Sequence, residues 1–154
     1  MKMVMCKTKD DTWYDLSHRL IESPWDEEAL DAFDQASQIH PNQYQVWYFR
    51  GGILSNLQRY EEAIASFDQA IQLQPNRSQA WYSRGLVLLQ LKRHEEAIAS
   101  FDRAIQIRSN DHQIWYFRGW ALLQLQRNDE AIACFDKVIQ IRPDYRLSWV
   151  NPEW

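Results

Sequence analysis

The sequence predicts an all-α protein in which helix–turn–helix hairpins stack into a solenoid. The first observation is a long period, in which tryptophan recurs at one constant interval at Trp47, Trp81, Trp115 and Trp149. The second is that apolar residues within each period recur at helical spacing. The third is that the 154 residues include only four glycines and five prolines, which favours long helices over a turn-rich β-fold.

Residues 44–77 illustrate one period. Two apolar stripes stand on either side of a break at Gln58–Arg59: Trp47, Gly51, Leu54 and Leu57 before it, and Ala63, Phe67, Ala70 and Ile71 after it. Pro75 ends the second helix, because proline lacks the amide donor and clashes with the preceding turn. Upstream, Ser23-Pro24-Trp25-Asp26 predicts a helix start with Ser23 as the N-cap.

Small and large side chains alternate between the two helices of each period. Glycines recur in the first helix at positions 51, 85 and 119, and alanines recur in the second at positions 63, 97 and 131. The absence of a Cβ at each glycine lets the helices approach, and a phenylalanine such as Phe67 fills the remaining space. One hairpin cannot cover its own apolar face, so neighbouring hairpins must stack.

These residues resemble the tetratricopeptide repeat. Trp47…Gly51, Ala63-x-x-x-Phe67, Ala70 and Pro75 follow the pattern of that family. The resemblance implies a right-handed α-solenoid with repeats at 10–43, 44–77, 78–111 and 112–145, which we number one to four. Residues 1–9 are then a flexible N-terminal tail, and residues 146–154 are an incomplete fifth repeat or a capping segment.

The resemblance also implies where a ligand binds. In this family the first helix of each repeat lines a concave groove, chiefly through its second, fifth, sixth, ninth and thirteenth positions. Here the expected peptide-binding residues are Tyr14, Gln45, Tyr48, Phe49, Gln79, Tyr82, Ser83, Leu86, Gln113, Tyr116, Phe117, Trp120 and Gln124. Gly52 and Asn56 occupy the ninth and thirteenth positions of repeat two, and Gln90 occupies the thirteenth position of repeat three.

The predicted groove is rich in aromatic and amide side chains. Aromatics give contact area with little rotamer entropy, and glutamine hydrogen-bonds a peptide in either direction. The recurring tyrosines have an alternative role as framework between adjacent first helices, whereas Phe49, Phe117 and Trp120 break the repeat pattern and favour binding. The chaperone-adaptor members of the family clamp a terminal carboxylate with lysine, arginine and asparagine, and no such set occurs at the matching positions.

Two charged patterns recur with the period. Arg50, Arg84 and Arg118 stand where the family usually has leucine, and each follows an aspartate of the preceding repeat, which predicts the pairs Asp34–Arg50, Asp68–Arg84 and Asp102–Arg118. Recognition of a phosphate or carboxylate by these arginines is the alternative. Glu61-Glu62 and Glu95-Glu96 are expected to be solvated residues that open the second helices.

Nothing in the sequence indicates catalysis. There is no HExxH motif, Gly-rich phosphate loop or serine elbow, so we predict no enzyme activity, no metal site and no cofactor. The formal net charge of −4 and the absence of a basic cluster argue against nucleic-acid binding. We expect no membrane span and a cytoplasmic location, in which Cys6 and Cys134 stay unlinked.

The apolar residues Trp149, Val150 and Trp154 follow the fourth repeat and leave three explanations open. The chain is a fragment, the segment folds back on repeat four, or the exposed end forms a homodimer. The function expected from the sequence is a protein-interaction adaptor that binds a peptide or protein segment in the groove. The alternative is a self-associating structural module or the repeat region of a larger protein.

Overall fold

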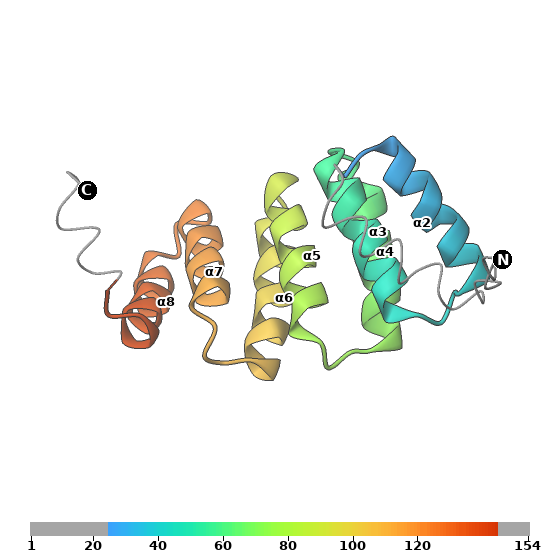
Figure 1. Cartoon of the computed structure of the whole chain (residues 1–154). Helices are drawn as coiled ribbons and strands as arrows, with labels where there is room; N and C mark the ends of the chain where they lie inside the picture. Colours follow the sequence, from blue (N-terminus) through green and yellow to red (C-terminus); the bar gives the residue numbers. More distant parts are fainter. Residues whose placement is uncertain (1–24, 145–154) are drawn as a thin grey trace, which may run out of the picture. The chain divides into compact units, whose positions relative to one another are not determined.

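The computed structural model describes residues 25–144 (Figure 1). Within this range the structure is helical and contains no strand. The chain divides into two compact parts at Pro75 and Asn76. We call residues 25–75 the N-terminal body and residues 76–144 the C-terminal body, and each is described by itself. Three predicted parts of the chain lie outside the described residues: the N-terminal tail, the first helix of repeat one with Tyr14, and residues 146–154.

The N-terminal body contains α2 (Glu27–Ile39), α3 (Tyr44–Asn56) and α4 (Tyr60–Leu73). Helix α3 packs against both α2 and α4. The break predicted at Gln58–Arg59 separates α3 from α4, and α4 ends two residues before Pro75, as the sequence predicts. The core of this hairpin includes Gly51, Leu54, Ala63, Phe67 and Ala70, all buried.

The predicted N-cap of α2 was wrong by three residues. Asp26, and not Ser23, caps this helix, since its Oδ1 accepts a hydrogen bond from the backbone N–H of Ala29 at 3.0 Å. Serine and aspartate are about equally good N-caps, so the sequence alone does not separate the two sites. With Asp26 as the cap, Glu27 and Glu28 fall in the first turn, where their negative charge suits the helix dipole.

The C-terminal body contains two complete hairpins. Helix α5 (Ser78–Gln90) packs on α6 (His94–Ile107), α6 packs on α7 (His112–Gln124), and α7 packs on α8 (Asn128–Ile141). The two first helices α5 and α7 also approach each other. Figure 1 shows these helices from green-yellow to red.

A phenylalanine ring lies over the glycine of each hairpin. A Cβ placed on Gly51 would stand 2.7 Å from the Phe67 ring, and one on Gly85 would stand 2.6 Å from the Phe101 ring. The sequence therefore correctly predicted that these glycines leave room for the partner helix. Gly119 has slightly more room, because its nearest atom would be on the Phe135 ring at 3.0 Å.

Each of the three hairpin turns contains one residue in the left-handed conformation, and none of these residues is glycine. Gln58, Lys92 and Gln126 have φ values of 61°, 57° and 58°, and they occupy the same position in successive repeats. In the first turn the Arg59 N–H donates to the Leu54 carbonyl at 2.8 Å and the Gln58 N–H donates to the Ser55 carbonyl at 3.0 Å. This pair of bonds is a Schellman motif, which satisfies the last carbonyls of the helix and reverses the chain.

Candidate functional site

In the C-terminal body the predicted binding residues lie on the two adjacent first helices. Four glutamines are exposed near the helix ends, Gln79 and Gln90 on α5 and Gln113 and Gln124 on α7. Between these ends lie the half-buried side chains Tyr82, Ser83, Leu86, Tyr116 and Phe117 together with Trp120, which is 38 % exposed. We call these ten residues the aromatic face. It has an apolar centre and an amide row at each edge.

Aromatic contacts connect the centre of the aromatic face to the core. The Tyr82 ring centroid is 6.0 Å from that of Phe117 and 6.1 Å from that of Phe101. The Tyr116 ring meets Phe117 edge-on at 5.2 Å and Phe135 edge-on at 5.9 Å. These contacts give both tyrosines a packing role, as the framework alternative expects, and they hold Phe117 in one place.

Trp120 is the most exposed aromatic residue of the aromatic face. Its ring meets His94 edge-on at the start of α6, with ring centroids 6.0 Å apart. A large indole that keeps more than a third of its surface in water is unusual for a residue whose role is packing. Trp120 is therefore the side chain of the aromatic face that is most available to a ligand.

The corresponding surface of the N-terminal body is partly filled by the chain itself. Gln45, Tyr48 and Phe49 are half-buried on α3. The ring centroid of Phe49 lies 6.0 Å from that of Phe33. The Trp25 ring covers Gly52 so closely that a Cβ there would be 2.5 Å from it. The Asn56 side-chain amide donates to the Trp25 carbonyl at 2.7 Å. The ninth and thirteenth positions of repeat two thus hold a segment of this chain.

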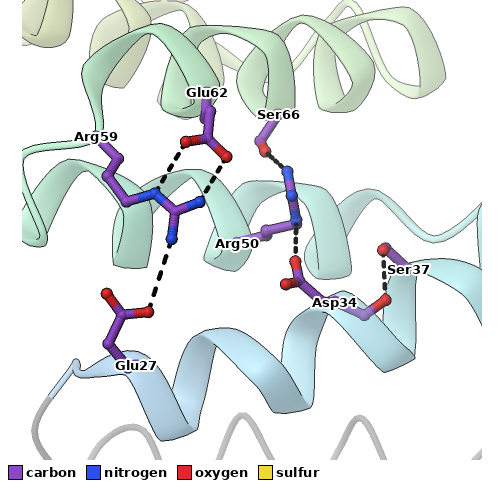
Figure 2. A network of polar contacts seen from close by, with 7 residues as sticks. All are labelled: Glu27, Asp34, Ser37, Arg50, Arg59, Glu62 and Ser66. Carbon is purple, nitrogen blue, oxygen red and sulfur yellow. Dashed lines mark hydrogen bonds and ion pairs between the residues drawn. The ribbon is translucent and has the colours of Figure 1, made fainter.

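The recurring arginines Arg50 and Arg118 form hydrogen bonds inside the chain, and Figure 2 shows those of Arg50. Arg50 Nε donates to Asp34 Oδ1 at 2.7 Å, and Arg50 Nη1 donates to Ser66 Oγ at 2.6 Å. Arg118 repeats this arrangement, with Nε to Asp102 Oδ1 at 2.6 Å. The predicted pairs Asp34–Arg50 and Asp102–Arg118 are confirmed. The pair Asp68–Arg84 joins residues of the two different bodies and stays a prediction.

The sequence analysis missed the third partner of each arginine. Ser66, Ser100 and Cys134 occupy the same position in repeats two, three and four, are buried, and accept a hydrogen bond from Nη1 of Arg50, Arg84 and Arg118. Each arginine of the two confirmed pairs divides its donors between two helices instead of binding the aspartate with both. The recurrence of serine at this position was visible in the sequence. With these donors engaged inside the chain, Arg50 and Arg118 are not available to clamp a phosphate or carboxylate.

Cys134 is the only one of these acceptors with a thiol. Arg118 Nη1 donates to its Sγ at 3.0 Å. Burial raises the pKa of the Cys134 thiol, and Arg118 lowers it only in part, so the group stays protonated at neutral pH. For Arg118, burial disfavours the charge, but the hydrogen bonds to Asp102 and Cys134 outweigh it and raise the pKa of the guanidinium above its usual value.

The acidic residues that open the second helices are more than solvated charges. Glu62, Glu96 and Glu130 each accept two hydrogen bonds from an arginine in the preceding turn, at distances between 2.7 and 2.9 Å. The bond from the arginine lowers the pKa of each of these carboxyl groups. The arginines are Arg59, Arg93 and Arg127, and Arg59 also approaches Glu27 at 3.6 Å (Figure 2).

Replacing Arg50 by methionine is expected to lower the free energy of unfolding by about 1 kcal/mol, because two hydrogen bonds of a largely buried guanidinium are lost. Its side chain is 20 % exposed. Arg59→Met is the matched control, since that side chain is 41 % exposed and solvent screens its ion pair with Glu62, so the loss should be much smaller. Urea unfolding followed by circular dichroism measures both. Equal losses would contradict the internal role of Arg50.

The described residues contain no cluster of three or more His, Cys, Asp or Glu arranged to hold a metal ion. None of the helices between residues 25 and 144 combines the length and the apolar character that a membrane span requires.

Comparison with known proteins places these features in a family. A profile described as tetratricopeptide repeat matches residues 27–77 and 53–112, and a second profile with the same description matches residues 112–145. Together they cover the hairpins described above. No curated protein matches the chain.

Several solved structures are similar in fold. MamA from Desulfovibrio magneticus RS-1, in a form spanning residue 41 to the end, is 25 % identical, with a TM-score of 0.81 over 90 % of this chain and 78 % of that one. A MamA RS-1 double mutant gives 25 % identity and a TM-score of 0.82 over the same shares. Another MamA crystal structure gives 18 % identity and a TM-score of 0.84 over 90 % and 81 %, and it supports the fold alone. The all-α solenoid class expected from the sequence is confirmed, and the chain belongs to the tetratricopeptide repeat family.

Proposed function

We propose that this protein is a non-catalytic interaction module that binds an apolar peptide segment of a protein partner on the aromatic face. The observation that carries the proposal is the exposure of Trp120, which lies one turn after the half-buried Phe117 on α7. Large aromatic side chains at the centre of a surface supply most of the energy in protein interfaces.

The amide rows indicate what kind of segment fits. On α5 the exposed Gln79 and Gln90 stand near opposite ends of the helix, about 16 Å apart along its axis at a rise of about 1.5 Å per residue. Glutamine offers both a donor and an acceptor, so a peptide backbone that crosses the face finds partners at both edges. None of the ten residues of the aromatic face is charged. We infer an uncharged ligand with one or two large apolar side chains and no requirement for a terminal carboxylate.

The test begins with peptides selected from a random library on the full chain, whose affinity is then measured by fluorescence anisotropy. Trp120→Ala is expected to weaken binding at least tenfold, because the ligand loses its main apolar contact. The matched control is Ile107→Ala on α6, where the side chain is 40 % exposed but lies outside the aromatic face. Equal affinities for the wild type and the folded Trp120→Ala variant would overturn the proposal.

The proposal also covers the compartment and the class of partner. The adaptor acts in the cytoplasm, and its partner is a protein and not a nucleic acid, consistent with a formal net charge of −4. Homodimerisation through the C-terminal end is the second candidate, favoured by the exposed Leu123 and Ile132. Sedimentation that finds only monomer at high protein concentration rules this second candidate out.

A further inference from the structure

The outer side of the last hairpin exposes apolar residues that are buried one repeat earlier. Leu89 is 7 % exposed and Ile98 is 5 % exposed, whereas their counterparts in the next repeat, Leu123 and Ile132, are 40 % and 56 % exposed. Phe101 is fully buried, and its counterpart Phe135 is only half-buried. Leu89, Ile98 and Phe101 lie in the hairpin α5–α6, which the first helix of the next repeat, α7, covers. Among the described helices, none follows α8 to cover it as α7 covers α6.

Two interfaces in this chain show what such a surface binds. Helix α6 receives α7, with Arg118 of α7 bonded to Asp102 of α6 at 2.6 Å. Helix α2 receives α3, with Arg50 of α3 bonded to Asp34 of α2 at 2.7 Å. In both cases a second helix presents an aspartate among apolar residues, and the following first helix supplies an arginine.

The same acceptor is present on α8. Asp136 is the counterpart of Asp102 in the next repeat and is exposed. On a helix, Asp136 lies on one face with Ile132 four residues before it and with Ile139 three residues after it, and both isoleucines are exposed. Within residues 25–144 no ion pair engages Asp136. We call Leu123, Ile132, Phe135, Asp136 and Ile139 the α8 end face.

We propose that the α8 end face is a second docking surface, for a helix of a partner protein that carries an arginine between large apolar residues. The arginine bonds Asp136 as Arg118 bonds Asp102, and the apolar residues cover Ile132 and Phe135. The partner is thus recognised by the same chemistry that joins α7 to α6.

Two other occupants, the residues that follow Asp144 and a second copy of this chain, fit this chemistry less well. The residues that continue the repeat after Asp144 place Pro152 where Arg118 stands in repeat four, and proline neither supplies the cation nor continues a helix. In a second copy, the first helix expected in repeat one has Leu16 at the arginine position. Pairing of two α8 end faces would bring two Asp136 carboxylates together, and like charges across an interface are unfavourable.

The probe is a stapled helical peptide with the sequence of residues 112–124, because α7 is the helix that occupies the equivalent surface of α6. Its binding to the full chain is measured by fluorescence anisotropy. We expect saturable binding, a loss of about tenfold with Asp136→Asn, and complete loss with Ile132→Glu. A peptide with citrulline in place of arginine should also bind about tenfold more weakly and be insensitive to Asp136→Asn.

The matched controls are Glu28→Gln and Ile39→Glu on α2, since Glu28 is exposed and Ile39 is 53 % exposed. Both should leave the affinity for the probe unchanged. The proposal is overturned if the wild type does not bind the probe, or if Asp136→Asn and citrulline have no effect. It is also overturned if binding appears only after Trp149→Ala, which would make residues 145–154 the occupant, or only on dilution of a dimer.

Discussion

Phe101→Ala is expected to lower the free energy of unfolding by about 3–5 kcal/mol, the usual cost of removing a fully buried phenylalanine. Phe101 is 0 % exposed. Its ring lies over Gly85, which has no side chain, and meets Tyr82, which would have to leave its contact with Phe117 to fill the space. The loss appears as a lower midpoint in urea unfolding followed by circular dichroism.

The matched control for this prediction is Phe135→Ala, the same substitution one repeat later. Phe135 is half-buried, so part of its surface is already in water and the loss should be roughly half as large. Because repeats contribute to stability with their neighbours, both variants are compared by their shift in midpoint as well as by free energy. Equal losses at the two positions would show that Phe135 is covered in solution.

Much of the fold could be predicted because the same residue types recur at the same positions in successive repeats. A single Phe67 within a helical stripe is a weak signal, but the same residue at positions 33, 101 and 135 makes a shared packing role the simplest explanation. The pairing of Asp34 with Arg50 was predictable for the same reason, since both positions recur in step. Periodicity converts weak local preferences into a consistent pattern.

Other features were not predictable, because they depend on contacts distant in sequence or on nearly equal local choices. Ser66 recurs as Ser100 one repeat later, but serine has no strong preference for burial, and its role appears only when Arg50 is seen to reach it. Trp25 covers Gly52 although the two residues are far apart in sequence, and no periodic signal marks that contact. The groove position at Gly52 followed the family pattern, whereas Trp25 stands where the three later repeats of this chain have arginine.

The left-handed turn residues show a third limit. Gln58, Lys92 and Gln126 adopt positive φ, which glycine adopts at no cost and other residues adopt rarely. No glycine marks these turns in the sequence, so the Schellman geometry could not be read from them. The break was nevertheless predicted at the correct place from the interruption of the apolar stripes.

The two adjacent glycines of α3 provide the second prediction, with opposite outcomes for the same substitution. Gly51→Ala is expected to lower the free energy of unfolding by up to about 2 kcal/mol, because overpacking costs roughly 1–3 kcal/mol and the gain in helix propensity offsets only about 1 kcal/mol of it. The new Cβ would meet the Phe67 ring at 2.7 Å, and that ring is 2 % exposed and has no room to move.

Gly52→Ala should instead leave stability unchanged or raise it by up to about 1 kcal/mol, since the helix gains an alanine and the group that must move is at the surface. The new Cβ would meet the outer edge of the Trp25 ring at 2.5 Å, and Trp25 is only half-buried. The ring should shift and open the ninth position of repeat two. Urea unfolding of both variants, with hydrogen exchange at Ala29 to monitor the start of α2, distinguishes the two outcomes. A loss at Gly52 as large as that at Gly51 would mean that Trp25 is held as firmly as the core, and that this surface is closed to ligands.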